Sequence, residues 1–407
     1  MLAPYIHSGR LKIVTECIPV SAEVTGDKID SVTIQHTPSN QAYVLTGRYI
    51  LDATETGELL PLANVEFRVG AESQKETGEP HALEEADPMN MQSFTHCFAM
   101  DYIEGEDFTI DKPEQYSFWK NYKADFWPDH LLSWTGVNPR TLEPVEYPLF
   151  SEGDQFSLWN YRRIMDTSLF DDAVFQSDIT LVNWQQIGYW LGPIINVSEE
   201  EKQTHLHAAK QLSLSFLYWM QTEAPRPDGK IGYPGLRLRS DVTGTIDGLA
   251  KKPYIRESRR IQALFTVLEQ HVSAIGRENE QIAPPFRDSV GVGCYRIDLH
   301  PSTQGRNYVD IPSLPFQIPL GSLIPVRMEN LLPACKNIGT THITNGCYRL
   351  HPVEWNIGEA SGALAAYCLQ NDLTPRAVYR SATHTLRFQN MLTSLGVEIA
   401  WPQLRRV

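Results

Sequence analysis

The feature that most restricts the fold of this chain is a short apolar run that ends in an acidic, glycine-containing loop. Residues 49–51 are tyrosine, isoleucine and leucine, and residues 52–58 have the sequence DATETGE. A nearly all-apolar run is typical of a strand that is buried on both faces of a sheet. Open α/β sheets bind ligands at the loops that follow their strands, so residues 52–58 are a first candidate binding loop.

An antiparallel sheet is expected ahead of this strand. Apolar and polar side chains alternate over residues 18–24 and again over residues 29–34, on either side of the turn-forming residues 25–28. This pattern predicts a hairpin. A third strand is expected at residues 43–45, after a turn at residues 38–40.

The middle of the chain, residues 71–320, differs from both ends and suggests a separate domain. It has long polar connections and many prolines. We expect one clear helix there, beginning after Ser198 and ending before Pro225, whereas residues 259–272 fit a helix or a strand. Six of the nine tryptophans suit either the core of this domain or a surface that stacks against sugars. They are Trp119, Trp127, Trp134, Trp159, Trp184 and Trp190.

The last ninety or so residues return to an alternation of strand and helix. We expect a strand at residues 331–334, a loop of Gly, Thr and Asn at residues 339–346, and a helix over residues 355–369. Gly358 and Gly362 lie on one face of that helix, where they allow close packing against a sheet. Thr374 and Pro375 predict the start of a further helix, and Gly396 the end of another.

Charge and cysteine content exclude several classes of protein. The 35 basic and 49 acidic residues give a net charge of −14, so we expect no nucleic-acid partner. The six cysteines form no CxxC pair, which suits a reducing compartment. No apolar run approaches the roughly 20 residues of a membrane helix. We therefore expect a soluble, cytoplasmic protein, provisionally, because a start upstream of Met1 would allow a signal peptide.

Local motifs of metal, nucleotide and nucleophile sites are absent from the sequence, which contains no HExxH, Walker loop, EF-hand loop or GxSxG. Residues 291–296, GVGCYR, fail as a dinucleotide fingerprint because Arg296 replaces the third glycine and a strand-like run follows. His205 and His207 are two residues apart on the expected helix and face different directions, so we expect no metal site.

Two polar segments remain as candidates. Residues 256–260, RESRR, are either a solvated charge run or a set of arginines that bind a carboxylate, a phosphate or a flavin edge. Residues 337–351 crowd eight polar side chains just ahead of the expected helix start near Trp355, where backbone amides favour electron-rich groups. The second segment suits a pyrophosphate or a flavin carbonyl edge, with an ordinary polar connection as the alternative. Its polar residues are Asn337, Thr340, Thr341, His342, Thr344, Asn345, Arg349 and His351.

Four stretches resemble the FAD-dependent oxidoreductases related to glutathione-reductase-type flavoproteins: residues 49–58, 253–260, 288–300 and, above all, 337–362. The resemblance implies an α/β (α+β) fold, a partial FAD/NAD(P)-binding-type three-layer arrangement with an inserted β-meander and a separate substrate or cap domain. It implies a partial FAD-binding domain with the β-meander in residues 1–70. Residues 71–320 would form the substrate or cap domain, and residues 321–407 would return to the FAD-binding domain.

The resemblance also implies an enzyme that oxidises a small organic substrate by hydride transfer to FAD. Its predicted catalytic residues are His351, His342 and Arg349. A histidine would either take the substrate proton or, together with Arg349, stabilise negative charge on the reduced flavin. The predicted FAD-binding residues are Ala53, Thr54, Glu55, Asn337, Gly339, Thr340, Thr341, Arg349, Gly358, Glu359 and Ala360.

The sequence departs from this family in two respects. Family members open with a strand, a GxGxxG turn and a helix that hold the FAD pyrophosphate, and the first residues of this sequence contain no such segment. We expect either a chain that lacks its N-terminal segment, an enzyme completed by a second chain, or a remnant that does not bind FAD. Glu55 stands where many related flavoproteins carry glycine.

Two functions of other classes stay open at this point. The first is a carbohydrate-binding or polysaccharide-processing protein that uses the tryptophan-rich middle domain. The second is a non-catalytic partner subunit that completes another chain. The sequence leaves the substrate, the electron acceptor and the oligomeric state undetermined.

Overall fold

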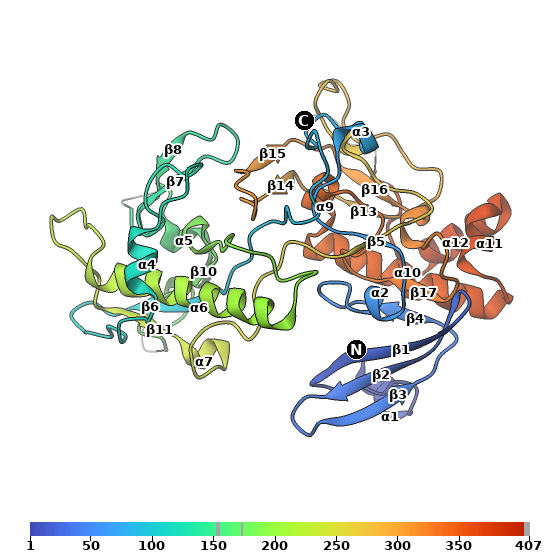
Figure 1. Cartoon of the computed structure of the whole chain (residues 1–407), viewed down its shortest axis with the longest axis horizontal. Coiled ribbons are helices and arrows are strands. Elements are labelled where there is room, and N and C mark those ends of the chain that lie inside the picture. Colours follow the sequence, from blue (N-terminus) through green and yellow to red (C-terminus); the bar gives the residue numbers. More distant parts are fainter. Residues whose placement is uncertain (152–154, 172–173, 403–407) are drawn as a thin grey trace.

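The computed structural model describes residues 1–151, 155–171 and 174–402. Figure 1 shows two lobes, one around the long helix α6, Glu199–Thr222, and one around the helix α10, His351–Asn371. A small sheet of N-terminal strands lies beside the α10 lobe. Helices and strands are mixed along the chain, which confirms the predicted α/β fold class. No helix in the described residues is long and apolar enough to cross a bilayer.

The N-terminal sheet is the predicted meander. It contains β1, Cys17–Thr25, β2, Lys28–His36, and β3, Gln41–Leu45, all antiparallel, and follows the short helix α1, Ala3–His7. The next strand, β4, Ile50–Asp52, pairs in parallel with β17, Leu331–Pro333. Both predicted strands are thus confirmed, and their pairing joins the two ends of the sequence.

The expectation that residues 49–51 are buried on both faces is wrong. Leu51 is 37% exposed, although the neighbouring Asp52 is fully buried. Within the described part of the chain, β4 pairs with β17 along one edge and with no strand along its other edge. The backbone of β4 is therefore unpaired along that second edge.

The α6 lobe contains a four-stranded antiparallel sheet in the order β11-β6-β10-β9. Ser198 caps α6 by accepting a hydrogen bond from the amide of Glu201, as predicted. The sheet strands are β6, Phe98–Tyr102, β9, Arg163–Met165, β10, Ile179–Val182, and β11, Leu236–Leu238. The remaining elements are α4, Tyr116–Asn121, β7, Thr135–Val137, β8, Pro144–Glu146, α5, Leu158–Tyr161, η1, Thr167–Leu169, η2, Gln185–Ile187, and α7, Ser240–Thr243.

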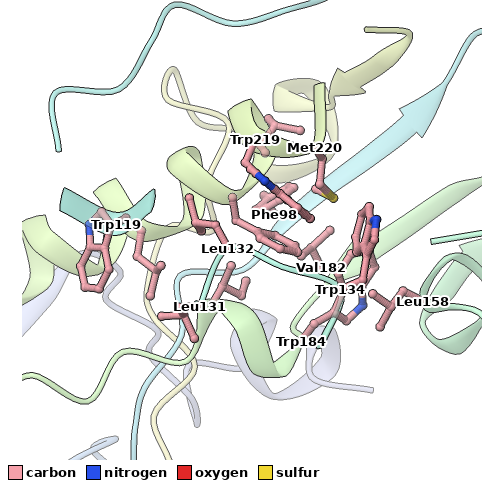
Figure 2. Packing of buried hydrophobic residues seen from close by; sticks show 14 of the residues in the cluster. Phe98, Trp119, Leu131, Leu132, Trp134, Leu158, Val182, Trp184, Trp219 and Met220 are labelled. Carbon is pink, nitrogen blue, oxygen red and sulfur yellow. The ribbon is translucent and has the colours of Figure 1, made fainter. Parts of the chain in front are cut away.

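The tryptophans of this lobe form a core. The six tryptophans between residues 119 and 190 are only 1–7% exposed and pack with Phe98, Phe216 and Met220 in one apolar cluster. Figure 2 shows Trp119, Trp134 and Trp184 among the buried leucines of this cluster. A surface that stacks against sugars is therefore ruled out for these residues, because their rings are buried against other apolar side chains.

The α10 lobe is built from paired short strands covered by helices. The pairs are β5, Phe67–Arg68, with β12, Arg260–Ile261; β13, Ser289–Gly293, with β16, Phe316–Pro319; and β14, Ile297–Leu299, with β15, Val309–Ile311. Its helical elements besides α10 are α2, Leu59–Leu62, α3, Gln74–Thr77, α8, Glu269–Val272, η3, Leu320–Leu323, α9, His342–Tyr348, α11, Pro375–Arg380, and α12, Ala382–Ser394. The predicted helix start at Thr374 and helix end at Gly396 are confirmed.

Two predicted boundaries near the C-terminus are wrong. The polar segment at residues 339–346 is not a simple loop, because α9 begins at His342 behind the N-cap Thr341. The helix expected from Trp355 begins at His351, where Pro352 suits the first turn.

The segment at residues 259–272, for which the sequence fits a helix or a strand, is neither a single helix nor a single strand. It contains β12, a connection and then α8.

The buried clusters do not follow the sequence in simple blocks. The α6-lobe cluster draws on residues 94–249 and Tyr308, whereas the α10-lobe cluster joins residues 267–324 to residues 332–397. A third, smaller cluster packs the meander against α2 and β17. The proposed domain boundaries at residues 70 and 320 stay a prediction.

Candidate functional site

The loop after β4 is held by its own polar side chains. Asp52 Oδ1 accepts hydrogen bonds from the amide and hydroxyl of Thr54, at 3.0 and 2.6 Å, and Thr54 Oγ1 accepts one from the amide of Glu58, at 2.7 Å. Gly57 adopts a φ of +64°, a conformation that favours glycine. The loop therefore has a fixed shape, and its turn presents Glu55, Thr56 and Glu58 on one side.

The second part of the site comes from the junction of α9 and α10. Arg349 follows α9 directly, is 5% exposed, and donates from Nη2 to the backbone oxygen of Asp298 at 2.9 Å. His351 is the first residue of α10, and its ring meets that of Tyr254 edge to face at 6.0 Å between centroids. Both side chains thus project from one short stretch between two helices.

These two parts line one cavity of about 350 Å³, which we call the β4–α10 cavity. Such a volume is within the range of small-molecule sites. Residues far apart in the sequence meet here, because β4 pairs with β17 and α10 packs beside the end of β17. A Cβ added at Gly358 of α10 would lie 3.2 Å from the backbone oxygen of Ala334, the residue that follows β17. The lining residues are Glu55, Thr56, Glu58, Ile194, Lys202, Leu206, Lys252, Pro253, Tyr254, Ile255, Lys336, Arg349, His351 and Glu354.

Lys336 is the electrostatic centre of this cavity. Its ammonium group forms ion pairs with Glu55 and, at 3.5 Å, with Glu354, although only 3% of the side chain is exposed. Burial opposes the charge of Lys336, but the two carboxylates outweigh burial and raise its pKa. Burial likewise opposes ionisation of Glu58, and hydrogen bonds from Thr54 and Thr56 nevertheless lower its pKa.

A buried donor points to a missing acceptor beside the cavity. Arg349 Nε is buried and has no hydrogen-bond partner among the described residues. Such a group costs free energy unless a ligand or water accepts from it. Four cationic side chains, Lys202, Lys252, Lys336 and Arg349, line the cavity with three carboxylates, and Asp298, outside the lining, pairs with Arg349 at 3.4 Å. The charges therefore balance, and the unpartnered donor is what favours an electron-rich group.

The structure brings three of the predicted site residues into the cavity lining and places the others elsewhere. Glu55, Arg349 and His351 line it. Ala53 is exposed and Thr54 half-buried within the same loop. Glu359 is exposed and lines a separate groove that also includes His351. Gly358 packs against β17, and Ala360 is buried in the core. The remaining predicted residues are buried and lie outside the cavity lining: Asn337, Gly339, Thr340, Thr341 and His342.

The buried predicted residues belong to a polar network rather than to the cavity lining. Asn337 Nδ2 donates to the backbone oxygen of Asp52 at 3.0 Å. Thr341 Oγ1 donates to Glu79 at 2.7 Å, and His342 Nδ1 lies 3.0 Å from Glu257 Oε1. These contacts connect the start of α9 to β4 and to the arginine-rich segment.

The arginine-rich segment 256–260 is not a solvated charge run. Arg256 and Arg260 are 3% and 0% exposed, and Arg260 donates to Glu72 at 2.8 Å and to the backbone oxygen of Gly70 at 2.7 Å. Arg259 donates to the backbone oxygen of Thr56 at 3.0 Å. The segment thus supports the loop after β4 from behind.

Sequence reasoning missed several lining residues. Lys336 stands one residue ahead of the stretch 337–362, and no local pattern indicates a buried lysine there. Tyr254 and Glu354 lie inside stretches on which the resemblance rests, yet neither was singled out. Among the described residues, no cluster of three or more His, Cys, Asp or Glu side chains is arranged to hold a metal ion.

Comparisons with known proteins give one match. A family model described as FAD dependent oxidoreductase matches residues 1–392 of the chain. No curated protein and no solved structure gives a significant match.

Proposed function

This chain belongs to the FAD dependent oxidoreductase family, and from that premise we propose that the β4–α10 cavity holds the flavin of an enzyme that oxidises a small organic substrate by hydride transfer. Family membership supports the general function and implies FAD as the cofactor. The assignment of the cavity rests on one observation above all: it is lined jointly by the loop after β4 and by the start of α10.

The residues of the cavity fit a flavin in their chemistry. Arg349 lines the cavity, and its unpartnered guanidinium nitrogen Nε would bond the carbonyl-bearing edge of such a ring after a turn of the side chain. The cationic side chains in the lining would stabilise a ring that gains negative charge on reduction. When bound, FAD supplies the site that accepts the hydride. Arg349, Lys336 and the backbone of the loop after β4 would hold it.

The protein residues supply orientation and proton handling. His351 lines the cavity from the first turn of α10 and is exposed, so an imidazole nitrogen can accept the hydroxyl proton of a substrate and pass it to solvent. Tyr254 packs against His351 and, on its ring face, against the guanidinium of Arg256 at 4.9 Å. This stack supports one side of the imidazole.

The pyrophosphate and adenosine need residues beyond those described. The glycines at residues 291 and 293 do not form an open cradle, because a Cβ at Gly291 would lie 2.4 Å from Asn356 and one at Gly293 would lie 2.3 Å from Phe316. We propose that a further nucleotide-binding segment, from this protein or from a second chain, completes the site. The uncovered edge of β4 offers it a place to pair.

The first test is the FAD affinity of the 407-residue chain by itself. We expect weak binding, without stoichiometric yellow FAD after purification, because the phosphates lack a glycine cradle. Flavin fluorescence during titration measures the affinity. Tight, stoichiometric retention of FAD would contradict the need for a further segment, although not the position of the flavin ring.

The second test is His351→Asn in the FAD-loaded enzyme. Asparagine keeps a polar side chain of similar reach but cannot take a proton, so flavin reduction should slow by roughly 10²–10⁴-fold, the usual contribution of a general base. Single-turnover absorbance of the flavin gives the rate, and His130→Asn, on an exposed loop of the α6 lobe, is the control. An unchanged rate would remove His351 from the mechanism.

A further inference from the structure

Part of the β4–α10 cavity is formed by the α6 lobe. Ile194, Leu206 and Ile255 line the cavity, and all three pack against the apolar cluster of that lobe. Lys202, near the start of α6, and Lys252 line it as well. We call these five residues the α6 wall. None of them belongs to the loop after β4 or to the junction of α9 and α10, the segments that would contact the flavin.

The charged side chains are unevenly distributed around the cavity. All three carboxylates of the lining, Glu55, Glu58 and Glu354, come from the loop after β4 and from α10. The α6 wall contributes two lysines and no carboxylate. The charges balance over the whole cavity, but this part of its lining is positive only. An anionic group of a ligand is therefore favoured at the α6 wall.

The two lysines of the α6 wall are not neutralised by buried partners. Lys202 Nζ lies 3.6 Å from Glu199, whose side chain is 71% exposed, and such an exposed pair contributes little free energy. Lys252 is exposed, and no carboxylate among the described residues lies within 4.0 Å of its ammonium group. Glu200 and Glu201, also near the start of α6, are exposed and do not line the cavity. Both ammonium groups can therefore bind an anion.

The other two cations of the lining are already paired. The ammonium group of Lys336 forms ion pairs with Glu55 and Glu354, and Arg349 pairs with Asp298 at 3.4 Å. An anion near either of them would also meet the charge of these carboxylates. The pairing therefore directs an anionic group to the α6 wall.

The aliphatic residues of the α6 wall favour a ligand with an apolar body. Ile194, Leu206 and Ile255 are each half-buried, so part of each side chain can contact a ligand. A short aliphatic chain packs against them without leaving a polar group unpaired. His351 is exposed and lines the same cavity. A ligand bound at the α6 wall therefore shares one cavity with the proposed proton acceptor.

We propose that the β4–α10 cavity binds a small aliphatic 2-hydroxy carboxylate as the substrate, with its carboxylate at Lys202 and Lys252. This inference rests on the proposed function, which places the flavin in the same cavity. In a 2-hydroxy acid the carbon that is oxidised is bonded directly to the carboxylate, so binding of the anion also positions that carbon.

The reaction is the oxidation of this acid to a 2-oxo acid. The C–H bond of the hydroxyl-bearing carbon breaks, and its hydrogen and electron pair are transferred as hydride to the flavin, which is reduced by two electrons. The hydroxyl proton goes to His351, and a C=O bond forms. The carboxylate keeps its charge throughout, so Lys202 and Lys252 bind substrate and product alike.

The test is calorimetric titration of the full chain, in the presence of millimolar FAD, with three probes: 2-hydroxybutyrate, its methyl ester and glycolate. The ester lacks the negative charge, and glycolate lacks the aliphatic body. We expect saturable binding of 2-hydroxybutyrate and binding of the other two that is weaker by about fivefold or more. Absence of saturable 2-hydroxybutyrate binding, or equally tight binding of the ester or of glycolate, overturns the proposal.

Substitution of the two lysines tests the position of the carboxylate. Lys202→Met and Lys252→Met should each weaken 2-hydroxybutyrate by about three- to fivefold, and the double variant by about tenfold or more. Lys252→Arg keeps the charge and should stay within about twofold of the parent chain. If both methionine variants leave the affinity unchanged, the acid binds elsewhere and the proposal fails.

Lys251→Met is the matched control. Lys251 is exposed like its neighbour Lys252 but does not line the cavity, so the variant changes the net charge equally and should leave the affinity unchanged. Equal weakening by Lys251→Met and Lys252→Met would reveal a long-range charge effect and would overturn the proposed contact. Melting temperatures should be alike in all these variants, because each of the three lysines is exposed or half-buried.

Kinetics give a second readout of the same variants. Because the lysines bind substrate and product alike, Lys202→Met and Lys252→Met should raise the 2-hydroxybutyrate concentration that gives half-maximal flavin reduction and leave the rate at saturation unchanged. A lower rate at saturation with an unchanged half-maximal concentration would contradict a role in substrate binding.

FAD titration of the lysine variants separates this inference from the proposed function. We expect an unchanged FAD affinity, because both lysines belong to the α6 wall. Flavin bound in the β4–α10 cavity without binding of 2-hydroxybutyrate would reject the substrate class alone. Lysine-dependent binding of 2-hydroxybutyrate together with a flavin bound outside the cavity would reject the proposed function alone. Weaker FAD binding in both methionine variants would assign the lysines to the cofactor and overturn the inference.

Discussion

Lys336 places a buried positive charge between Glu55 and Glu354 at the wall of the β4–α10 cavity. Lys336→Met should lower the free energy of unfolding by about 1–3 kcal/mol, at or below the usual cost of breaking a buried pair, because Glu55 is half exposed and regains water. Urea unfolding measures the change. Glu55→Gln, the matched control, should cost less than about 1 kcal/mol. Equal losses in the two variants would contradict a central role for the lysine.

Two buried histidines make stability depend on pH. Burial lowers the pKa of His96 to about 4, and burial together with the charge of Arg256 lowers that of His300 to about 4. An unfolded chain protonates these rings near pH 6.5. Between about pH 6.5 and pH 4 the unfolded state thus binds more protons, so stability is present above this window and is lost as the pH falls through it.

His96→Leu tests this dependence directly. Both ring nitrogens of His96 are buried without a partner in the described residues, so leucine should fold well at pH 7. The slope of unfolding free energy against pH between 4.5 and 6 should decrease by about 1.4 kcal/mol per pH unit, the value for one proton. Urea unfolding at several pH values gives the slope. An unaltered slope would mean that His96 is protonated in the folded state.

At the residue scale, the sequence predicts which kinds of side chain the site contains better than it predicts which residues line the cavity. Arg349 and His351 were singled out from a crowded polar segment, and both line the cavity. His342 and Thr341, from the same segment, are buried in a network with Glu257 and Glu79 instead. Local sequence cannot separate the two groups, because the partners lie 85 and 262 residues away along the chain. Lys336 was missed for the same reason, since Glu55 is 281 residues distant.

At the scale of elements, three glycines near the site should respond differently to alanine. A Cβ at Gly339 would lie 2.4 Å from Ala263 Cβ, one at Gly358 would lie 3.2 Å from the oxygen of Ala334, and one at Gly362 would meet nothing within 4 Å. Gly339→Ala should therefore destabilise by about 1–3 kcal/mol, and Gly362→Ala should stabilise α10 by about 0.5–1 kcal/mol.

Gly358→Ala should fall between the other two, because its contact with β17 is tight but not overlapping. Thermal and urea unfolding of the three variants measure the order. The close packing predicted for Gly362 is wrong, because nothing lies within 4 Å of a Cβ added there. A destabilising Gly362→Ala would contradict this open space.

Elements with local patterns were predicted well, and elements made by tertiary contacts were not. The meander follows from alternation and a turn, and α6 from its cap and apolar face. Helix α9 was missed because Thr, Asn and Gly have low helix propensity. It forms because Thr341 caps it and because every residue from His342 to Tyr348 is buried. The parallel pairing of β4 with β17 leaves no local mark in the sequence.

At the scale of the whole molecule, the two lobes have separate cores. The tryptophans stabilise the α6 lobe, and the cluster around α10 stabilises the other. The β4–α10 cavity lies where the two lobes meet, because Leu206 of α6 and His351 of α10 both line it.

The most direct test of the central claim is an experimental structure of the chain with FAD at millimolar concentration, which offsets the weak affinity expected of the isolated chain. We predict the flavin ring in the β4–α10 cavity, in contact with both the loop at residues 55–58 and the start of α10 at residues 349–354. A flavin ring bound outside the β4–α10 cavity, or touching only one of these two segments, would contradict the account.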